Sequence, residues 1–145
     1  MEVLQVDTTS RCQMIDLTDR VQAAVQAAGL KRGLVGIFVP HTTAGITINE
    51  NADPDVAQDM LRQLEQMVPQ HQNFYRHAEG DSAAHLKASM VGSSVIVIVE
   101  QETLRLGRWQ GLCCVNSTAP AHGMSGCTSP PTDEWDIPRP SPQFT

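Results

Sequence analysis

Three histidines lie beside acids, amides or hydroxyls in separate parts of the chain. His41 directly follows an apolar run, whereas His77 and His85 enclose a short acidic stretch that contains Glu79 and Asp81. Imidazole is a common ligand of divalent metal ions, and three histidines with an open fourth position form a known catalytic zinc arrangement. Carboxylates nearby can ligate the ion, orient a ligand or act as a general base. We therefore predict His41, His77 and His85 as ligands of a divalent metal (Zn²⁺ or Mg²⁺), and Glu79 and Asp81 as catalytic groups.

Further polar side chains could bind a small ligand beside those histidines. The segment 45–51 alternates apolar and polar residues, which predicts a half-buried strand with Asn49 and Asn51 on its polar face. Thr43 lies in a flexible stretch just before this strand, and Lys87 could contact an anionic group. We predict all four residues as ligand-binding.

Each of these assignments has a plain structural alternative. His41 could be hydrogen-bonded at the end of a strand, and His85 could be an ordinary residue near the start of a short helix. The spacing of His77 and His85 does not match the H-E-x-x-H motif or a zinc-finger pattern. A metal site, a non-catalytic binding site and a purely structural role are all compatible with these residues alone.

Apolar periodicity predicts an α+β fold that would position these residues, with a mainly antiparallel sheet and two or three helices packed on it. Helix signals include Thr18 as an N-cap, Gly29 as a stop, and Asp53 as an N-cap followed by Pro54. The run 33–40 has the pattern of a buried strand, and 104–112 that of a strand returning in a hairpin. The predicted strands are residues 2–10, 33–40, 45–51, 93–99 and 104–112, and the predicted helices cover about 18–28, 54–69 and 82–90.

The overall composition excludes several classes of protein. The chain has 145 residues, is 41% hydrophobic and carries a formal net charge of −6, with its basic residues scattered. This argues against a nucleic-acid partner held by phosphate contacts. Because no apolar run is long enough to span a membrane and no secretory signal is evident, we expect a cytoplasmic protein. The four cysteines show no metal-binding spacing, so free thiols are expected.

Three long segments together resemble the YjbQ family over about residues 1–111. They are HTTAGITINENADPDV (41–56), YRHAEGDSAAHLKAS (75–89), and the pair GSSVIVIVE and LRLGRWQG (92–111). The resemblance implies an α+β fold that assembles as a homotrimer, with a polar, metal-binding site near a subunit boundary. Members are often labelled secondary thiamine-phosphate synthases, which implies a side activity joining a hydroxymethylpyrimidine diphosphate to a thiazole phosphate. The residues that match the family's histidines and polar segments are His41, His77, His85, Asn49, Asn51, Glu79 and Asp81.

The chain departs from the family after about Gly111. Family members continue through a strand similar to CEFDGPRTR and a final basic, apolar strand, whereas this chain reads CCVNSTAPAHGMSGCTS. A shifted reading frame from Cys114 onward permits the family motif, so we hypothesise a frameshift between about Gly111 and Val115. The expected organisation is an incomplete YjbQ-like domain (1–111) that lacks its last strand, which would leave a sheet edge open. A disordered tail rich in Pro, Ser and Cys (112–145) would follow it.

Two functions of different classes follow from the sequence. The first is an enzyme that uses a divalent metal and a small phosphorylated or otherwise anionic metabolite, with thiamine-phosphate synthesis as a side activity. The alternative is a non-catalytic trimeric protein that binds a metal or a small metabolite in the same site.

Overall fold

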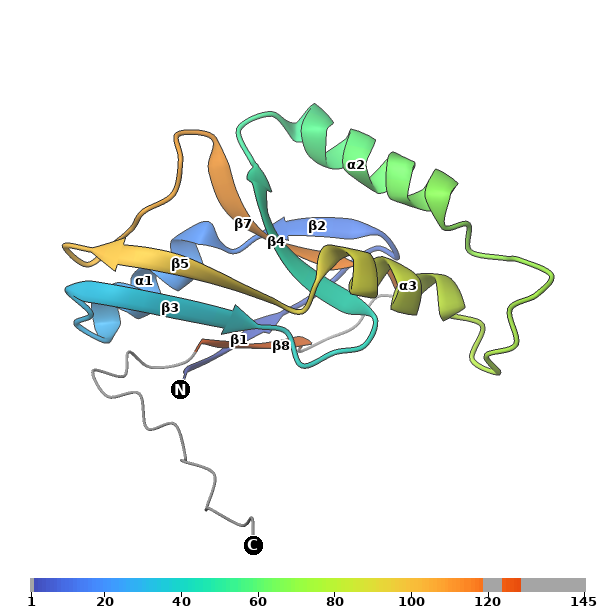
Figure 1. The fold of residues 1–145 in the computed structure, drawn as a ribbon, viewed down its shortest axis with the longest axis horizontal. Helices are drawn as coiled ribbons and strands as arrows, with labels where there is room; N and C mark the ends of the chain where they lie inside the picture. The colour runs from blue at the N-terminus through green and yellow to red at the C-terminus, as the bar shows by residue number, and fades with distance from the viewer. Residues whose placement is uncertain (1, 119–123, 129–145) are drawn as a thin grey trace, which may run out of the picture.

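The computed structural model describes residues 2–118 and 124–128, which form two antiparallel sheets and three helices (Figure 1). The predicted α+β class with a mainly antiparallel arrangement is confirmed, although the strands divide between two sheets. One sheet has the strand order β1 (Glu2–Val6), β8 (Met124–Thr128), β3 (Arg32–Phe38), β5 (Ser94–Glu100) and β6 (Thr103–Leu104). The other has the order β2 (Gln13–Asp16), β7 (Gln110–Asn116) and β4 (Ala44–Glu50). The helices are α1 (Thr18–Ala27), α2 (Pro54–Met67) and α3 (Ser82–Val91).

One apolar cluster joins α1 to the inner faces of both sheets. Its members are aliphatic residues and a cysteine, as expected for a chain with few aromatic residues. Burial of this surface is the main favourable contribution to folding. The cluster includes Val21 and Val25 of α1, Val35 and Ile37 of β3, Ile46 of β4, Val97 and Val99 of β5, and Leu112 and Cys114 of β7.

The helix boundaries follow local chemistry. Asp53 accepts a hydrogen bond from the backbone N–H of Asp55 (2.9 Å) and Pro54 is the first residue of α2, so the predicted N-cap is confirmed. α1 already includes Thr18 as its first residue, and Leu17 occupies the N-cap position that the sequence predicted for Thr18. The Thr18 hydroxyl instead accepts a hydrogen bond from the N–H of Leu112 (2.9 Å), which ties the helix to β7.

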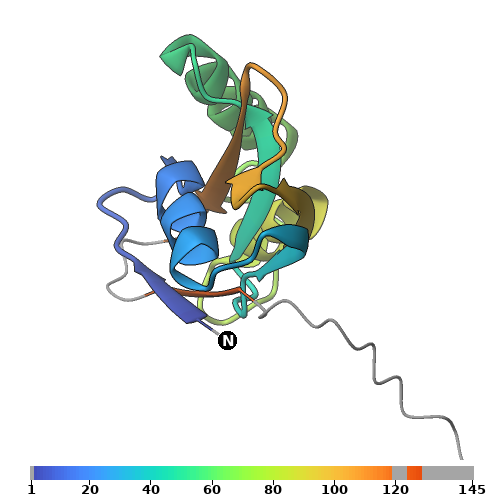
Figure 2. The ribbon, with the colours of Figure 1, turned by 90° about the vertical axis from the view of Figure 1, so that its left-hand side faces the viewer.

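α2 lies at the upper edge of the molecule in both views (Figure 1, Figure 2). None of its residues is fully buried, although apolar residues recur along one side at helical spacing. That side faces a shallow depression of about 330 Å³, bounded by Met60 and Leu64 of α2, Thr47 of β4 and Met90 of α3. α2 is therefore an outlying element whose attachment to the remaining fold depends on few contacts.

The predicted hairpin between 93–99 and 104–112 is wrong. β6 pairs with β5 at only two positions, after which the chain crosses into the other sheet and runs between β2 and β4 as β7. The physical reason is burial: residues 111–116 of β7 are all buried, so this strand needs cover on both faces. The edge position beside β5 would leave it without that cover.

The interpretation of 33–40 as a fully buried strand is wrong for one face. β3 and β5 pair along their whole length, and alternate residues such as Val35 and Val97 point into the core. The other face is open and apolar: Leu34 is 50% exposed, and Ile96 and Ile98 of β5 are 67% and 60% exposed.

Packed structure extends beyond Gly111, which differs from the expected boundary of the tail. β7 continues to Asn116, and β8 pairs with both β1 and β3, so backbone pairing is present where an open edge was expected. Residues 119–123 and 129–145, which belong to the expected tail, lie outside the described residues. Within the described chain, no helix combines the length and apolarity that crossing a membrane requires.

Candidate metal centre and adjoining pocket

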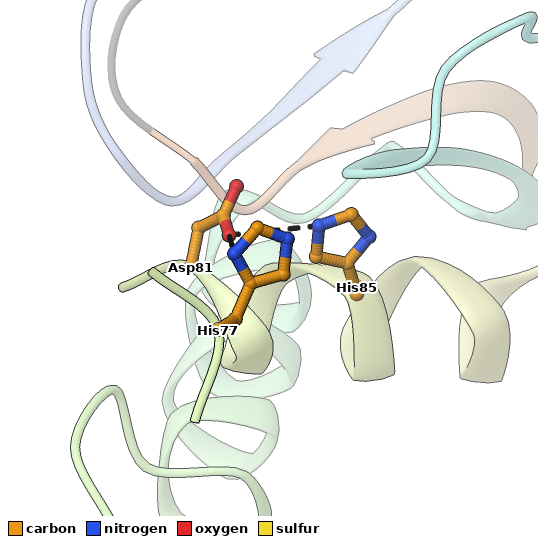
Figure 3. Close-up of side chains that lie close together, drawn as sticks. All are labelled: His77, Asp81 and His85. Atoms are coloured by element: carbon orange, nitrogen blue, oxygen red, sulfur yellow. Dashed lines mark ion pairs between the residues drawn. The ribbon is translucent and has the colours of Figure 1, made fainter. Parts of the chain in front are cut away.

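Two histidines and one carboxylate meet where the chain enters α3 (Figure 3). Asp81 precedes the helix and His85 lies in its first turns, so their spacing of four places them on one side of the helix. Asp81 Oδ1 lies 3.5 Å from Nε2 of His85 and 3.6 Å from Nδ1 of His77, which comes from the preceding loop. The two imidazole rings stack, with centroids 5.2 Å apart and planes at 18°. Each residue offers a ligand atom within 4.8 Å of those of the other two.

Asp81 occupies the N-cap position of α3 without capping it. Its side chain makes no cap hydrogen bond, in contrast to Asp53 at the start of α2. Asp81 Oδ1 is buried and has no hydrogen-bond donor among the described residues. A buried carboxylate oxygen without a donor is costly. A divalent cation would satisfy this oxygen, and an oxygen with two imidazole nitrogens is a suitable donor set for several such ions. On His77 the ligand atom would be Nε2, because Nδ1 accepts the N–H of Glu79.

Backbone contacts orient His77. The N–H of Glu79 donates to Nδ1 of His77 (3.2 Å), and the N–H of Gly80 donates to the His77 carbonyl oxygen (3.0 Å). Gly80 has a φ of +73°, a left-handed conformation that glycine adopts without steric cost. The Glu79 residue itself is exposed, so its backbone rather than its carboxylate contributes to the geometry described here.

A depression of about 500 Å³ adjoins this group and joins His85 to His41. His41 reaches it from the loop after β3, whereas His85 and Ser89 reach it from successive turns of α3. Ser89 Oγ also donates to the carbonyl oxygen of His85 (2.9 Å). No lysine or arginine is present among the described residues that line the depression. These are His41, Thr42, Ala44, His85, Ala88, Ser89, Gly92 and Ser93.

The structure therefore groups the predicted histidines in two ways. His77 and His85 join Asp81 in one cluster, while His41 shares only the depression with His85 and lies outside the set of close ligand atoms. Thr43 is not among the lining residues, although its neighbour Thr42 is.

The other three predicted ligand-binding residues lie elsewhere and have partners within the protein. Asn49 stands near the far end of β4, and its Nδ2 lies 3.1 Å from Sδ of Met60. Asn51 Nδ2 donates to Asp16 Oδ2 (2.9 Å). Lys87 is only 1% exposed, and its ammonium pairs with Glu65 of α2.

Sequence reasoning missed three hydroxyl-bearing residues of the depression. Ser89 continues the spacing of four that relates Asp81 to His85, so helical periodicity could have identified it. Thr42 lies in the same motif as His41 and Thr43, but the sequence does not show which threonine faces the site. Ser93 follows α3 and carries no local signal.

The family model described as UPF0047 protein YjbQ-like matches residues 2–122. The chain belongs to the YjbQ-like UPF0047 family. The match reaches past Gly111, in agreement with the packed β7. UPF0047 protein YugU of Bacillus subtilis is 53% identical over 112 residues, which cover 77% of this chain and 85% of that protein.

Solved structures of YjbQ-like proteins share the fold. A crystal structure of an uncharacterised YjbQ/UPF0047 protein from Clostridium acetobutylicum matches with a TM-score of 0.85 and 42% identity, covering 89% of this chain and 98% of that one. A conserved hypothetical protein from Thermus thermophilus matches with a TM-score of 0.82 and 38% identity, with coverage of 89% and 98%. The YjbQ-like fold is thus established for this chain, whereas the names of these relatives carry no biochemical activity.

Proposed function

We propose that His77, Asp81 and His85 hold a divalent metal ion that serves the adjoining depression, where a small phosphorylated or otherwise anionic metabolite binds. The observation that supports this most directly is the buried Oδ1 of Asp81, which faces two imidazoles and has no hydrogen-bond donor among the described residues. The proposed ligand set has two histidines and one carboxylate, and so replaces the three-histidine set expected from the sequence. Zn²⁺ is compatible with these donors, and Mg²⁺ less so because it prefers oxygen ligands.

The surrounding residues would bind and orient the metabolite. Because no described lining residue is a lysine or arginine, positive charge for an anionic group must come from the metal and from imidazole. His41 lines the same depression as His85, where it could hold or move a proton, and Thr42 and Ser89 offer hydroxyl groups. A bound divalent ion would act as a Lewis acid toward an oxygen of the metabolite.

Thiamine-phosphate synthesis is retained as a proposed side activity, and its support is the family resemblance. In that reaction the thiazole nitrogen attacks the methylene carbon of the pyrimidine substrate, and diphosphate leaves. Because the attacking nitrogen carries no proton, this step needs no general base. The exposed Glu79 carboxylate would instead orient a bound ligand, since Asp81 faces the imidazoles.

The alternative is a non-catalytic protein that binds a metal or a small metabolite in the same place. One observation favours it. The Asp81 carboxylate points toward His77 and His85, and Asp81 is not among the described residues that line the depression. Turnover separates this alternative from the enzyme, because both are compatible with metal binding.

The proposed assembly is a homotrimer, supported by the open apolar face of β3 and β5. Leu34 and Ile98 are register partners on this face, and Ile96 lies two residues along β5. An apolar sheet face of this kind is stabilised when another surface covers it. A second copy of the chain would be that surface.

Metal analysis of the purified protein tests the proposed function. We expect a near-stoichiometric divalent ion after loading with Zn²⁺, and a loss of affinity of at least about tenfold in Asp81→Asn and His77→Ala. Asp59→Asn is the matched control, because this α2 carboxylate is 77% exposed and lies outside the cluster. A wild-type protein that takes up no metal under any loading condition would overturn the proposal.

A growth assay tests turnover and the tail together. We expect the frame-restored gene to rescue a strain that lacks thiamine-phosphate synthase, and His41→Ala to abolish the rescue. The gene for the 145-residue chain is tested in the same strain, and its result shows whether the chain supports activity with its present C-terminal sequence. Failure of the frame-restored gene, with metal binding intact, would favour the non-catalytic alternative.

A further inference from the structure

A second polar cluster lies behind the candidate metal centre, on the other side of α3. Lys87 follows His85 by two residues, which corresponds to a rotation of about 200° around a helix, so the two side chains leave α3 in opposite directions. The Lys87 side chain is 1% exposed, and its ammonium donates to Oε2 of Glu65 on α2. The Sγ of Cys12, which precedes β2, lies 3.6 Å from the same oxygen. The Glu65 cluster, defined as Cys12, Glu65, Gln70 and Lys87, thus joins separate parts of the chain.

Gln70 connects this cluster to the loop that carries His77. Its backbone contributes to lowering the pKa of the Glu65 carboxyl, and its Nε2 donates to the carbonyl oxygen of Gly80 (2.9 Å). Gly80 directly precedes Asp81, and its own N–H closes a turn onto the His77 carbonyl oxygen. A short path of polar interactions therefore runs from Glu65 through Gln70 to the backbone between His77 and Asp81.

Charge keeps this path intact at neutral pH. The hydrogen bond from Lys87 is the main cause that lowers the pKa of Glu65, with burial opposing it, so the carboxylate stays ionised. Burial is the main cause that raises the pKa of Cys12, so its thiol remains a neutral donor to Glu65. An almost fully buried lysine is rare without an ionised partner, and removal of that partner is strongly destabilising.

We propose that Glu65, Gln70 and Lys87 are positioning residues that hold Asp81, His77 and His85 in the arrangement that receives the divalent ion. Lys87 fixes α3, which carries His85, against α2. Gln70 fixes the backbone beside Asp81. This inference rests on the proposed function, because it assigns the cluster a role at that same site. Residues that support metal ligands from behind typically change metal affinity by about 10- to 100-fold when they are replaced.

Two variants test this role by different routes. Glu65→Gln keeps the shape of a half-exposed side chain but removes the charge that pairs with Lys87, whereas Gln70→Ala leaves that ion pair intact and removes the contact to Gly80. We expect each to weaken Zn²⁺ binding by at least about tenfold, measured by competition with a chelating dye. Asp59→Asn is the control on α2, because its ion pair with Arg62 is exposed, and its affinity should match wild type.

Amide hydrogen exchange supplies a readout that needs no metal. We expect faster exchange in residues 80–84 of both variants. In Gln70→Ala, which keeps the ion pair of Lys87 with Glu65, the strands of the core should exchange as in the wild-type protein. Folded variants with unchanged Zn²⁺ affinity and unchanged exchange at 80–84 would overturn the positioning role. If the wild-type protein itself binds no Zn²⁺, the proposed function fails, and amide exchange alone decides whether the cluster positions the loop.

Discussion

Asp53 and Asp81 occupy the same helical position and have different surroundings. Asp53 caps α2 through the N–H of Asp55, and its role could be predicted from the Asp-Pro sequence. Asp81 also directly precedes a helix, yet its oxygen faces two imidazoles and its side chain caps nothing. The sequence places both residues directly before a predicted helix, and both are residue types that favour the N-cap. Only the path of the loop before α3 decides which of the two is available for a ligand.

The buried thiols allow a residue-scale prediction about pH. Burial, followed by the neighbouring Cys113, raises the pKa of Cys114 to about 11, against about 8.5 in an unfolded chain. Because the folded state favours the neutral thiol, this contribution to stability is present below about pH 8.5 and is lost as the pH rises toward 11. The expected loss over that range is about 3 kcal/mol.

Urea unfolding at about pH 8, 9 and 10 measures this effect. Wild-type protein should lose more stability over the series than Cys114→Ala, which lacks the titrating thiol. Parallel curves for the two proteins would contradict the assignment of the pKa shift to burial.

At the scale of elements, the approach of β4 to the end of α3 places the metal centre beside the depression. The N–H of Ile46 donates to the carbonyl oxygen of Gly92 (2.9 Å), and Ala44 and Gly92 both line the depression. A Cβ on Gly45 would lie 2.6 Å from the Gly92 oxygen and 2.8 Å from Cγ1 of Val91. Glycine at this position is therefore required by close packing and not by backbone conformation.

Gly45→Ala should destabilise the fold by about 1–3 kcal/mol, because a backbone oxygen cannot move away as a flexible side chain can. Gly29→Ala is the control, because the added Cβ would have no atom within 4 Å. Its only expected cost is the left-handed backbone conformation (φ +65°), which destabilises alanine by about 1 kcal/mol. Chemical denaturation of both variants measures the difference. Equal destabilisation would show that the contact between β4 and α3 is looser than described.

At the scale of the whole molecule, the two faces of the sheet that contains β3 and β5 have different environments. The inner face of these strands is buried in the core, whereas Leu34, Ile96 and Ile98 on the outer face are at least half exposed. A sequence run that is apolar on both faces predicts burial on both faces. The single chain buries only one, which is why the homotrimer is proposed to cover the other.

Ile98→Lys should shift the protein from trimer to monomer while retaining its fold, since a buried interface would then contain an unpaired charge. Light scattering coupled to size-exclusion chromatography measures the mass, and circular dichroism measures the fold. Met67→Lys is the matched control, because Met67 is 56% exposed on α2 and away from the sheet. A monomeric wild-type protein, or a trimeric Ile98→Lys variant, would contradict the proposed interface.

The sequence alone determined the α+β class, the family and most helix boundaries, and it predicted a site in the segments around His41, His77 and His85. These features depend on local periodicity, capping residues and contiguous motifs. Tertiary structure alone decided that Asp81 joins His77 and His85, that His41 stands apart from them, and that Lys87 pairs with Glu65. It also decided that β7 leaves the sheet of β5. These outcomes depend on contacts between residues far apart in the chain, where burial and charge pairing select one arrangement from several that the local sequence permits.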